Sequence, residues 1–373
     1  MKNTVYSIAE RGRKADIIDF INYVFSNAHC PHDFKILLPK VYADNGEENI
    51  EDYHYIAEQD GKIVACVANR PTTLVIGGRT LKCGYVGSVS VHPYHRGEGH
   101  MKKLMSMVLA DAKKAGLDMI ILGGQRQRYA YFGFEKIGTR LDFELNPSNV
   151  RHAMADVREE GVVIRDMRPE EAEFARGLWE KRYYSSKRDN MFMELTTWGN
   201  VPKIIEIDGR TAGYRSGSEI VPENEADFLR VAKSIAVREG KTVYFLVNPA
   251  DTQRIAALGA IAEDVKLVSQ EMANVLNWKN VLEICLESKD RVCPLGDAEA
   301  VLDIEGDGVF RVCVKDGRAS VSPAEKTENA VRLTHNGAQR LFFSLDGGFT
   351  GVPEGFPRGW TQLPFYISEM DCF

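Results

Sequence analysis

The stretch VSVHPYHRGEGHMKKLM, residues 89–105, constrains the fold more than any other part of the chain. A β-branched segment runs into a basic turn with two glycines, and an amphipathic segment follows. Met101, Leu104, Met105 and Val108 recur there at helical spacing, so they share one face of a predicted helix. The first N–H groups of a helix have no partner within it and favour an anion. The stretch therefore predicts a strand, an anion-binding turn and a helix, in that order.

The segments around this turn predict a mixed α/β fold. Residues 15–25 have helical spacing of apolar residues, and residues 53–93 alternate strand-like runs with Asp-Gly and Gly-Gly turn signals. That alternation is typical of an antiparallel meander of three strands. MIILGG, residues 119–124, is a short, wholly apolar run typical of a buried strand in parallel pairing. Residues 129–138 then predict a turn and a final strand that closes the unit as a hairpin.

A polar stretch near residue 150 marks a boundary, and the sequence after it echoes the first part. KIIEIDGRTAGYRSG, residues 203–217, resembles HYIAEQDGKIVACVANR, residues 54–70, and each contains an Asp-Gly turn. A helical and a strand-like segment follow, but no glycine turn precedes that helix. The pattern predicts a duplicated fold whose second copy has lost its ligand loop, with units over 1–150 and 151–271.

A third unit is predicted over residues 272–373. It opens with an apolar helix, MANVLNWKNVLEICL (272–286), and continues with short strands around Gly306, Asp316-Gly317 and Asn336-Gly337. GAQRLFFSL, residues 337–345, predicts a further helix. Chain ends are usually polar and frayed, whereas this one is rich in apolar residues: Phe365, Tyr366, Ile367, Met370 and Phe373. We therefore expect the tail to dock against the rest of the chain.

Composition argues against several classes of protein. The formal net charge of −6 gives no basic face for nucleic acid. No apolar run approaches the ~20 residues needed to span a bilayer, and the N-terminal residues lack the apolar core of a signal peptide. The 7 cysteines are scattered without metal-ligand spacing, which is typical of reduced core thiols. We expect a cytoplasmic protein with no metal, no nucleic-acid partner and no membrane partner.

Two familiar phosphate-binding patterns do not fit the glycine turn. A nucleotide-binding P-loop requires Lys followed by Ser or Thr after its last glycine, and no such pair follows Gly97 or Gly99. A dinucleotide-binding turn requires three spaced glycines and an acidic residue at the end of the next strand. Only the first two glycines are present, and the strand at 119–124 ends in glycines.

The turn resembles the R-x-x-G-x-G/A loop of the GNAT (GCN5-related N-acetyltransferase) family, with Arg96 as the arginine and Gly99 as its conserved-type glycine. The strand, turn, helix and parallel strand come in the order of that fold, although Met101 stands where the family has a small residue. The resemblance implies that acetyl-CoA is the co-substrate, with its diphosphate on the loop and its pantetheine arm along the strand. The implied contacts are Val89, Ser90, Val91, Arg96, Gly97, Glu98, Gly99, His100 and Met101.

The resemblance narrows to the Eis (enhanced intracellular survival) acetyltransferases, in which tandem GNAT-type folds precede a domain similar to sterol carrier protein 2. The opening stretch, RYAYFGFEKIG (128–138) and the terminal Phe373 carry this resemblance. It implies that Tyr129 is the general acid and that the carboxylate of Phe373 is the base. Tyr131 is the second candidate for the acid, and either tyrosine is alternatively a core aromatic of the hairpin.

The implied acceptor site draws on residues far apart in the sequence. Glu369 and Asp371 lie near the terminus and would attract a cationic amine, although Cys372 stands where the Eis pattern has an acidic residue. A second group either lies where the family's cleft helices meet or forms a helix end. This group is His29, His32 and Asp33.

The sequence thus predicts an N-acetyltransferase that moves acetyl from acetyl-CoA directly to a primary amine of a small, cationic acceptor. Aminoglycoside-like compounds, polyamines and peptide amines all fit this description, and the resemblance implies a homo-oligomer, a trimer or a hexamer. The alternative is a catalytically inactive regulatory protein that binds acetyl-CoA or lipid, which Met101 and Cys372 favour. GEEN, residues 46–49, predicts a solvated loop outside the site.

Overall fold

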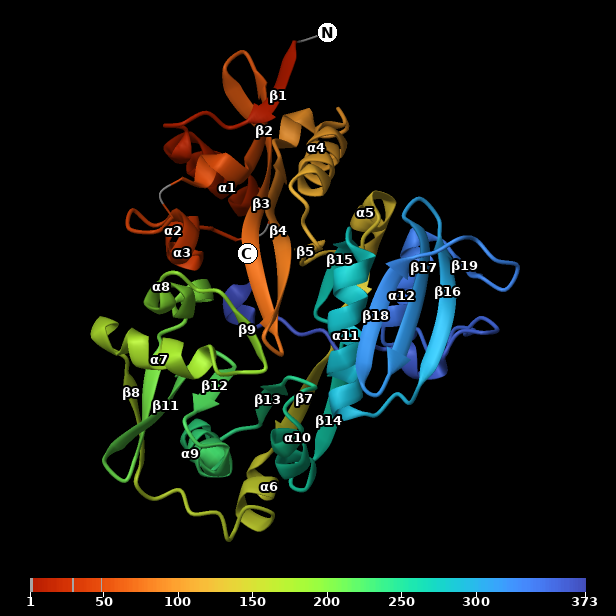
Figure 1. Ribbon diagram of the computed structural model, residues 1–373. Coiled ribbons are helices and arrows are strands. Elements are labelled where there is room, and N and C mark those ends of the chain that lie inside the picture. The colour runs from red at the N-terminus through yellow and green to blue at the C-terminus, as the bar shows by residue number, and fades with distance from the viewer. Residues whose placement is uncertain (1–2, 29, 48) are drawn as a thin grey trace.

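The computed structural model describes residues 3–28, 30–47 and 49–373. These residues form four β-sheets with helices packed against them, which confirms the mixed α/β fold (Figure 1). His29, one of the candidate acceptor residues, lies outside the described residues. No helix within the described ranges is long and apolar enough to cross a bilayer.

The first sheet contains the predicted meander. Its strand order is β1-β2-β3-β4-β5-β15-β6, and β9 pairs with β3 beyond this path. As the sequence predicts, β2, β3 and β4 pair antiparallel and β4 pairs with β5 in parallel. The strands are β1 (Thr4–Ile8), β2 (His54–Gln59), β3 (Lys62–Ile76), β4 (Arg79–Val91), β5 (Met119–Leu122), β6 (Glu135–Ile137), β9 (Tyr184–Ser186) and β15 (Glu271–Val275).

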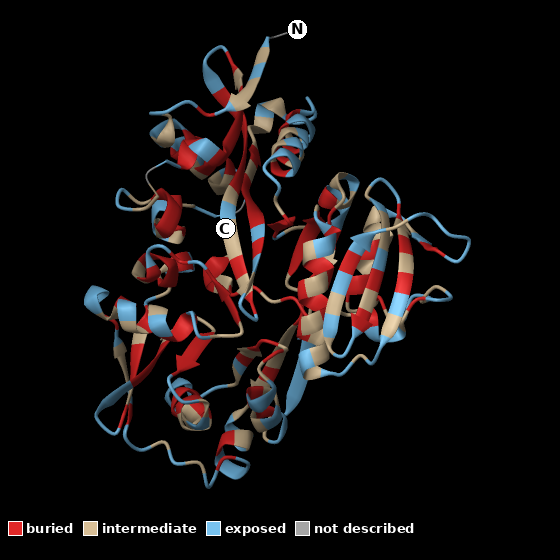
Figure 2. Ribbon diagram, viewed as in Figure 1, coloured by how far each residue is buried: buried red, intermediate tan, exposed pale blue. Residues whose placement is uncertain are grey.

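Helices α1 (Lys14–Ala28) and α4 (His100–Lys114) cover opposite faces of this sheet. Because side chains alternate along a strand, Ile56 of β2 packs in the cluster under α1, and its neighbours Tyr55 and Ala57 pack in the cluster under α4. β2 and the adjoining parts of β3 and β4 are accordingly buried (Figure 2). Two short helices, α2 (Phe34–Leu37) and α3 (Pro39–Tyr42), complete the face that α1 covers.

Strand β15 corrects the prediction of a helix from residue 272. Residues Glu271–Val275 form a strand that pairs antiparallel with β5 on one side and β6 on the other. The helix, α11 (Trp278–Val292), begins only after Asn277, whose side chain caps it. A short apolar run fits a buried strand as well as a buried helix, and only the two neighbouring strands decide between them. The chain therefore returns to the first sheet before it builds its last part.

The predicted hairpin after the turn at 129–138 is also wrong. β6 pairs with β15, whereas the following strand, β7 (Arg140–Leu145), leaves this sheet and pairs with β13 (Val243–Val247) and β14 (Asp264–Val268). A helix, α6 (Pro147–His152), follows β7 and begins with a capping box at Asn146. The polar stretch near residue 150 is thus partly helical, and β7 joins the first part of the chain to the second.

The second part has the features of the predicted repeat. Asp60 and Asp208 both have φ 51°, and the glycine after each also has positive φ, so both hairpins turn in the same way. A 3-10 turn, not a glycine turn, precedes α9. The remaining elements are β8 (Val162–Asp166), α7 (Ala172–Trp179), α8 (Met191–Leu195), β10 (Lys203–Ile207), β11 (Arg210–Ser216), β12 (Glu219–Pro222), α9 (Phe228–Glu239) and α10 (Thr252–Gly259).

The last part is a four-stranded sheet packed on two helices. The sheet has the order β18-β17-β16-β19, and α12 (His335–Phe343) is the predicted second helix. The turn predicted at Asn336-Gly337 is instead the first turn of α12, which Thr334 caps. The strands are β16 (Ala298–Ile304), β17 (Gly308–Lys315), β18 (Arg318–Pro323) and β19 (Val331–Leu333).

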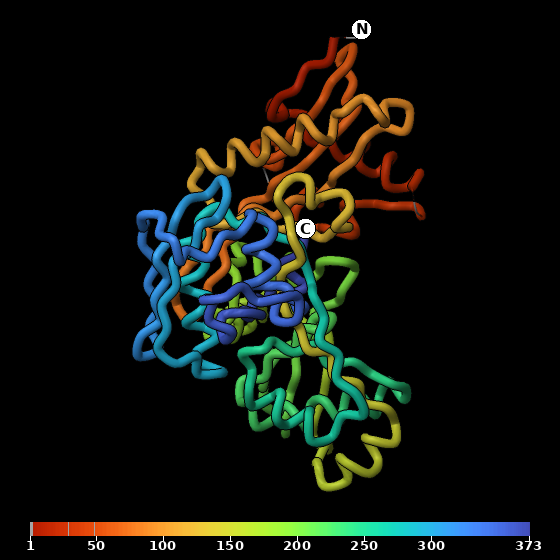
Figure 3. The backbone as a smooth tube through the Cα atoms, turned by 90° about the vertical axis from the view of Figure 1, so that its right-hand side faces the viewer, coloured from red at the N-terminus to blue at the C-terminus, as the bar shows by residue number. Residues whose placement is uncertain are grey.

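The tail, residues 361–373, is docked as the sequence predicts. Phe365 is fully buried, and Ile367 and Met370 are each 1% exposed. Figure 3 shows the blue end of the chain in the middle of the molecule, between the first sheet and the second part. Its last residue reaches β4 (Figure 1).

Buried charges hold the tail in place. The guanidinium of Arg188 donates two hydrogen bonds of 2.8 Å to Glu219 and one of 2.8 Å to Asp371. Ser368 donates to the same Glu219, and the Lys40 ammonium donates to the carbonyl of Met370 at 2.6 Å. A buried charge is tolerated only where it is paired and hydrogen-bonded, so each of these groups fixes the others.

Replacing Arg188 with Gln is expected to destabilise the protein by about 3–5 kcal/mol, because Glu219 and Asp371 would remain buried without their cation. Arg168→Gln, which removes an arginine that is 65% exposed, is the matched control and is expected to cost less than about 1 kcal/mol. Urea unfolding at pH 7 measures both. Equal midpoints for the two variants would contradict the role of Arg188.

Candidate active site

The parallel pairing of β4 and β5 ends abruptly. Cys83–Val86 pair with Met119–Leu122, after which β5 gives way to Gly123-Gly124 and β4 continues to Val91. The backbone of residues 87–91 on that side has no strand partner within the described part of the chain, so it can accept hydrogen bonds from, and donate them to, an extended ligand. We call this opening the fork. The predicted pantetheine contacts Val89, Ser90 and Val91 lie along it.

A β-bulge shapes the fork. Gly87 pairs with Ala68 and Ser90 with Cys66, so two residues of β4 stand opposite Val67 alone. Ser88, inside the bulge, has φ 50°. A bulge leaves backbone N–H groups outside the ladder, and such groups are the donors that stabilise a developing oxyanion.

A chain of buried side chains fixes the bulge. The Ser88 hydroxyl lies 2.7 Å from Tyr42 Oη, which lies 2.9 Å from His54 Nε2. His54 Nδ1 lies 2.6 Å from the carbonyl of Ile50 and must donate to it, so Nε2 accepts from Tyr42. Burial lowers the pKa of His54 to about 4, which keeps its ring neutral. Because the chain ends at a carbonyl and His54 stays neutral at neutral pH, its role is to position the bulge.

The glycine turn has the form of an anion-binding loop. Gly97 and Gly99 have φ 83° and 84°, and a Cβ added to either would meet nothing within 4 Å. The turn therefore faces open space at the N-terminus of α4, and the exposed Arg96 forms no ion pair with any described residue. Met101 is half-buried against the core under α4. Its side chain, larger than the residue of the family motif, therefore fills the core and leaves the loop open.

The side chain of Glu98 folds back from the loop. It accepts hydrogen bonds from Gln59 at 3.1 Å and pairs with His100 at 3.0 Å, and the bond from Gln59 is the main reason that the pKa of Glu98 is lowered. His95, Glu98 and His100 thus offer ligand atoms within 4.8 Å of one another, a grouping that the sequence prediction of no metal had not included. His100 Nδ1 also lies 2.8 Å from Tyr6 Oη. These hydrogen bonds explain why the three side chains lie together: they support the loop.

Tyr129 lies at the fork on the face that α4 covers. It ends α5 (Arg126–Tyr129), is 8% exposed, and packs its ring against Phe134 at a centroid distance of 6.2 Å and against Gly124. Burial raises the pKa of Tyr129, so its hydroxyl keeps its proton at neutral pH. Tyr131, the second candidate, is 70% exposed and lies under the ammonium of Lys102.

Phe373 lies at the fork on the other face. A Cβ placed on Gly87 would stand 2.5 Å from the Phe373 ring and 3.0 Å from its backbone oxygen. The ring packs between Tyr42, Tyr53 and His54, with centroid distances of 6.2–6.4 Å. The terminal carboxylate therefore lies beside the bulge, and the two predicted catalytic residues flank the fork from opposite faces.

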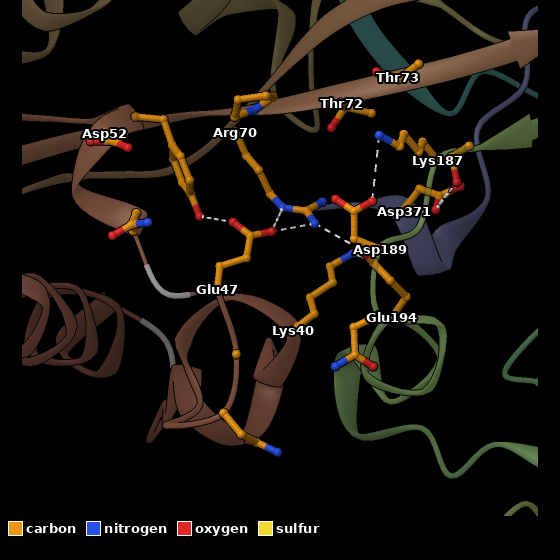
Figure 4. A pocket seen from close by; sticks show the side chains of 17 residues that line it. Lys40, Glu47, Asp52, Arg70, Thr72, Thr73, Lys187, Asp189, Glu194 and Asp371 are labelled. Carbon is orange, nitrogen blue, oxygen red and sulfur yellow. Dashed lines mark hydrogen bonds and ion pairs between the residues drawn. The ribbon is translucent and has the colours of Figure 1, made fainter. Parts of the chain in front are cut away.

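A cavity of about 510 Å³ opens beside the tail (Figure 4). We call it the β3 cavity, since Arg70 of β3 lies at its centre. Arg70 pairs with Glu47 at 2.7 Å and with Glu194 at 2.9 Å, and Lys40 pairs with Glu194 at 2.9 Å. Burial alone would raise the pKa of Glu194, but the attraction of Lys40 and Arg70 outweighs it and lowers that pKa to about 2. Asp371 of the tail also lines the cavity.

The predicted acceptor residues have mostly structural contacts. Asp371 accepts from Ser186 at 2.6 Å and from Arg188, and Glu369 pairs with Arg140 at 2.8 Å, so both anchor the tail. Asp33 caps α2, which fits the alternative of a helix end. His32 packs near Phe25 and Phe34. Of these four candidates, only Asp371 lines the β3 cavity.

Apart from Asp371, the charged residues of the β3 cavity were missed by the sequence interpretation. Glu47 belongs to the predicted solvated loop GEEN, of which Glu48 lies outside the described residues; Asn49 is exposed as predicted, whereas Glu47 pairs with Arg70 and accepts a 2.5 Å hydrogen bond from Tyr53. Lys40 lies on α3 and Glu194 on α8, far apart in the chain, and Arg70 lies within β3. No local pattern links these positions, so the sequence carries no signal for them.

Comparison with known proteins agrees with this geometry. Residues 6–137 match the sequence model of the acetyltransferase (GNAT) domain family. They cover β1 to β6, which include the fork, the bulge and the glycine loop. No curated protein sequence matches the chain. The chain thus carries a GNAT acetyltransferase domain, and it is an acetyl-CoA-dependent acyltransferase.

Solved structures share the fold over nearly the whole chain. A GCN5-related N-acetyltransferase from Anabaena variabilis has a TM-score of 0.70 at 16% identity, with 100% of each chain covered. One from Kribbella flavida has a TM-score of 0.68 at 17% identity, with 100% of this chain and 99% of that chain covered. Eis1 from Mycobacterium abscessus has a TM-score of 0.61 at 13% identity, with 91% of this chain and 89% of that chain covered. At these identities the likeness is one of fold.

Gly87→Ala is expected to displace the terminal residue, since the new Cβ would collide with Phe373. Turnover should fall by on the order of 100-fold while acetyl-CoA binding is retained, because a misplaced reacting group costs rate more than affinity. Gly177→Ala, on α7 with open space around it, is the matched control. Steady-state kinetics and calorimetric binding test this. Wild-type turnover in Gly87→Ala would mean that the terminus lies away from the reacting centre.

The Glu194 ion pairs predict a pH dependence of stability. The pKa of Glu194 is lowered from 4.5 to about 2 in the folded protein, so its contribution is complete above about pH 4.5 and is lost as the pH falls toward 2. The difference in free energy of unfolding between the wild type and Glu194→Gln should therefore shrink between pH 4.5 and 3. Urea unfolding at a series of pH values measures it. A constant difference would show that Glu194 titrates normally.

Proposed function

We propose that the protein is an N-acetyltransferase that moves the acetyl group of acetyl-CoA to a primary amine of a small acceptor. The observation that carries the proposal is the pair of groups at the fork. Tyr129 lies on one face and the carboxylate of Phe373 on the other, with the bulge between them. An acetyl thioester held along residues 87–91 would lie between an acid and a base.

The chemistry follows from that placement. The terminal carboxylate accepts a proton from the acceptor nitrogen, whose lone pair attacks the thioester carbon and forms the C–N bond. Backbone N–H groups at the bulge stabilise the tetrahedral oxyanion. The C–S bond then breaks, and Tyr129 gives its proton to the departing sulfur. The products are the N-acetyl amide and CoA thiol; the carboxyl group of Phe373 then loses its proton to solvent and Tyr129 regains one, which restores both groups.

Direct transfer is favoured over an acetyl-enzyme intermediate. Cys372 adjoins the terminal residue and is the cysteine best placed to act as a nucleophile, but burial raises its pKa and keeps it a thiol. Its Sγ lies 3.6 Å from a carboxylate oxygen of Glu271, whose own pKa burial raises. An acidic residue at position 372 would face this buried carboxyl group, which gives a physical reason for the cysteine.

The acceptor amine is proposed to enter through the β3 cavity. Tyr53 lines that cavity and packs against the Phe373 ring, and Asp371 borders it from the tail. Aminoglycoside-like compounds, polyamines and peptide amines therefore all belong in an acceptor panel.

The finer parts of the sequence interpretation extend this proposal. We take residues 1–150 as the catalytic unit, 151–271 as a degenerate second copy, and 272–373 as a domain similar to sterol carrier protein 2. An Eis-like assembly into a trimer or hexamer, a cytoplasmic location and a reaction without a metal belong to the same proposal. The alternative, an inactive acetyl-CoA- or lipid-binding regulator, loses support because Met101 faces the core and Cys372 fits a buried site.

The test is release of CoA thiol from acetyl-CoA with the amine panel. Tyr129→Phe should lower turnover by on the order of 100-fold with little change in acetyl-CoA affinity, since it removes the acid and keeps the ring. Tyr131→Phe, which alters an exposed tyrosine, is the matched control and should leave turnover unchanged. Acetyl-CoA binding without thiol release for any amine would favour the regulatory alternative. If only Tyr131→Phe lost turnover, Tyr131 and not Tyr129 would be the general acid.

A further inference from the structure

The carboxylates that line the β3 cavity are already paired. Glu47 pairs with Arg70, Glu194 with Lys40, and Asp371 with Arg188, at 2.7–2.9 Å. At the rim, Asp52 pairs with Arg11 at 2.8 Å and Asp189 lies 3.9 Å from Lys187. A ligand with several positive charges would have to break the pairs inside the cavity to gain its own, whereas the two rim pairs are exposed and weak. The cavity is therefore poorly suited to a polycation.

Two hydrogen-bond donors on β3, by contrast, have no partner among the described residues. Arg70 uses Nε and Nη2 for its carboxylate partners, whereas Nη1 forms no hydrogen bond with any described residue. The hydroxyl of Thr72 is buried and has no hydrogen-bond partner among the described side chains and backbone. Buried polar atoms are nearly always satisfied, so an unpaired one next to a cavity indicates a missing partner. The ammonium of Lys187 lies at the rim, 3.9 Å from Asp189, as Figure 4 shows.

These donors lie in line with the reacting centre. Residues 68, 70 and 72 of β3 point to the same face of the sheet, and Ala68 pairs with Gly87, on which Phe373 packs. At a rise of ~3.3 Å per residue, Arg70 is roughly 7 Å along the strand from the row that holds the terminal carboxylate. This spacing lets one small molecule place its amine at that carboxylate and an anionic group at Arg70.

We propose that the acceptor is an amine that also bears a carboxylate, an amino acid or short peptide, and that Arg70 and Thr72 bind this carboxylate while the amine lies at Phe373. The inference rests on the proposed acetyl transfer and names its substrate class. A guanidinium edge and a hydroxyl suit a carboxylate because both donate charge-assisted hydrogen bonds. Arg70 is held rigid by Glu47 and Glu194, so little entropy is lost when it binds.

Matched acceptor pairs test the substrate class. The pairs are γ-aminobutyrate against butylamine, lysine against cadaverine, and a dipeptide against its C-terminal amide. In each pair where the acid is acetylated, its kcat/KM should exceed that of the partner lacking the carboxylate by at least about tenfold. The three pairs also distinguish α-amino acids, ω-amino acids and peptides as sources of the same chemistry.

Two variants test the residues. Thr72→Val keeps the shape of the side chain and should remove most of the preference for the acid, mainly through KM. Arg70→Lys keeps the charge for Glu47 and Glu194, removes the guanidinium edge, and should also reduce the preference. Thr80→Val, at an exposed position of β4, is the control and should keep the wild-type ratio.

The outcomes separate the two proposals. Equal or better acetylation of the amines without a carboxylate, or an unchanged ratio in Thr72→Val, would overturn the substrate class and leave acetyl transfer standing. If acetyl-CoA binds but no amine of either group causes release of CoA thiol, the acetyl transfer itself is overturned. Should Arg70→Lys fail to fold, Thr72→Val decides alone.

Discussion

The position of the chain's last residue depends on the buried ion pairs of the tail. Arg188 binds Glu219 and Asp371, Lys40 binds Glu194 and the carbonyl of Met370, and all of these groups are away from water. Such pairs contribute little to net stability, but each is costly to break, and they therefore specify one arrangement of the groups they join. Here they specify where a terminal carboxylate stands relative to a bulged strand.

This constraint makes the three parts of the chain interdependent. The glycine loop and the fork come from the first part, Glu194 and Arg188 from the second, and β15 and the tail from the last. β15 also lies between β5 and β6, so the face on which Tyr129 packs includes Met272 of that strand. The donor half of the site is local in sequence. The proposed acceptor half is lined by residues of all three parts.

The successes and failures of the sequence interpretation follow this division. The strand, glycine turn and helix around Gly99 are confirmed, because turn chemistry and helical spacing act within a few residues. The helix expected from residue 272 and the hairpin expected from residues 129–138 are wrong, because β15, which is distant in the chain, pairs with both β5 and β6. Glu47 was assigned to a solvated loop because its partner Arg70 lies 23 positions away, on a strand whose face was unknown.

The sequence by itself determined the glycine turn and the helix behind it, since their conformations are set by local sterics and helical spacing. It also determined that the tail is apolar enough to be buried. Only the tertiary structure decided where that tail ends, which tyrosine is buried at the fork, and which charges in the β3 cavity are free. Those outcomes depend on contacts between distant residues, and a buried charge or hydroxyl is satisfied or left unpaired only once the whole chain has packed around it.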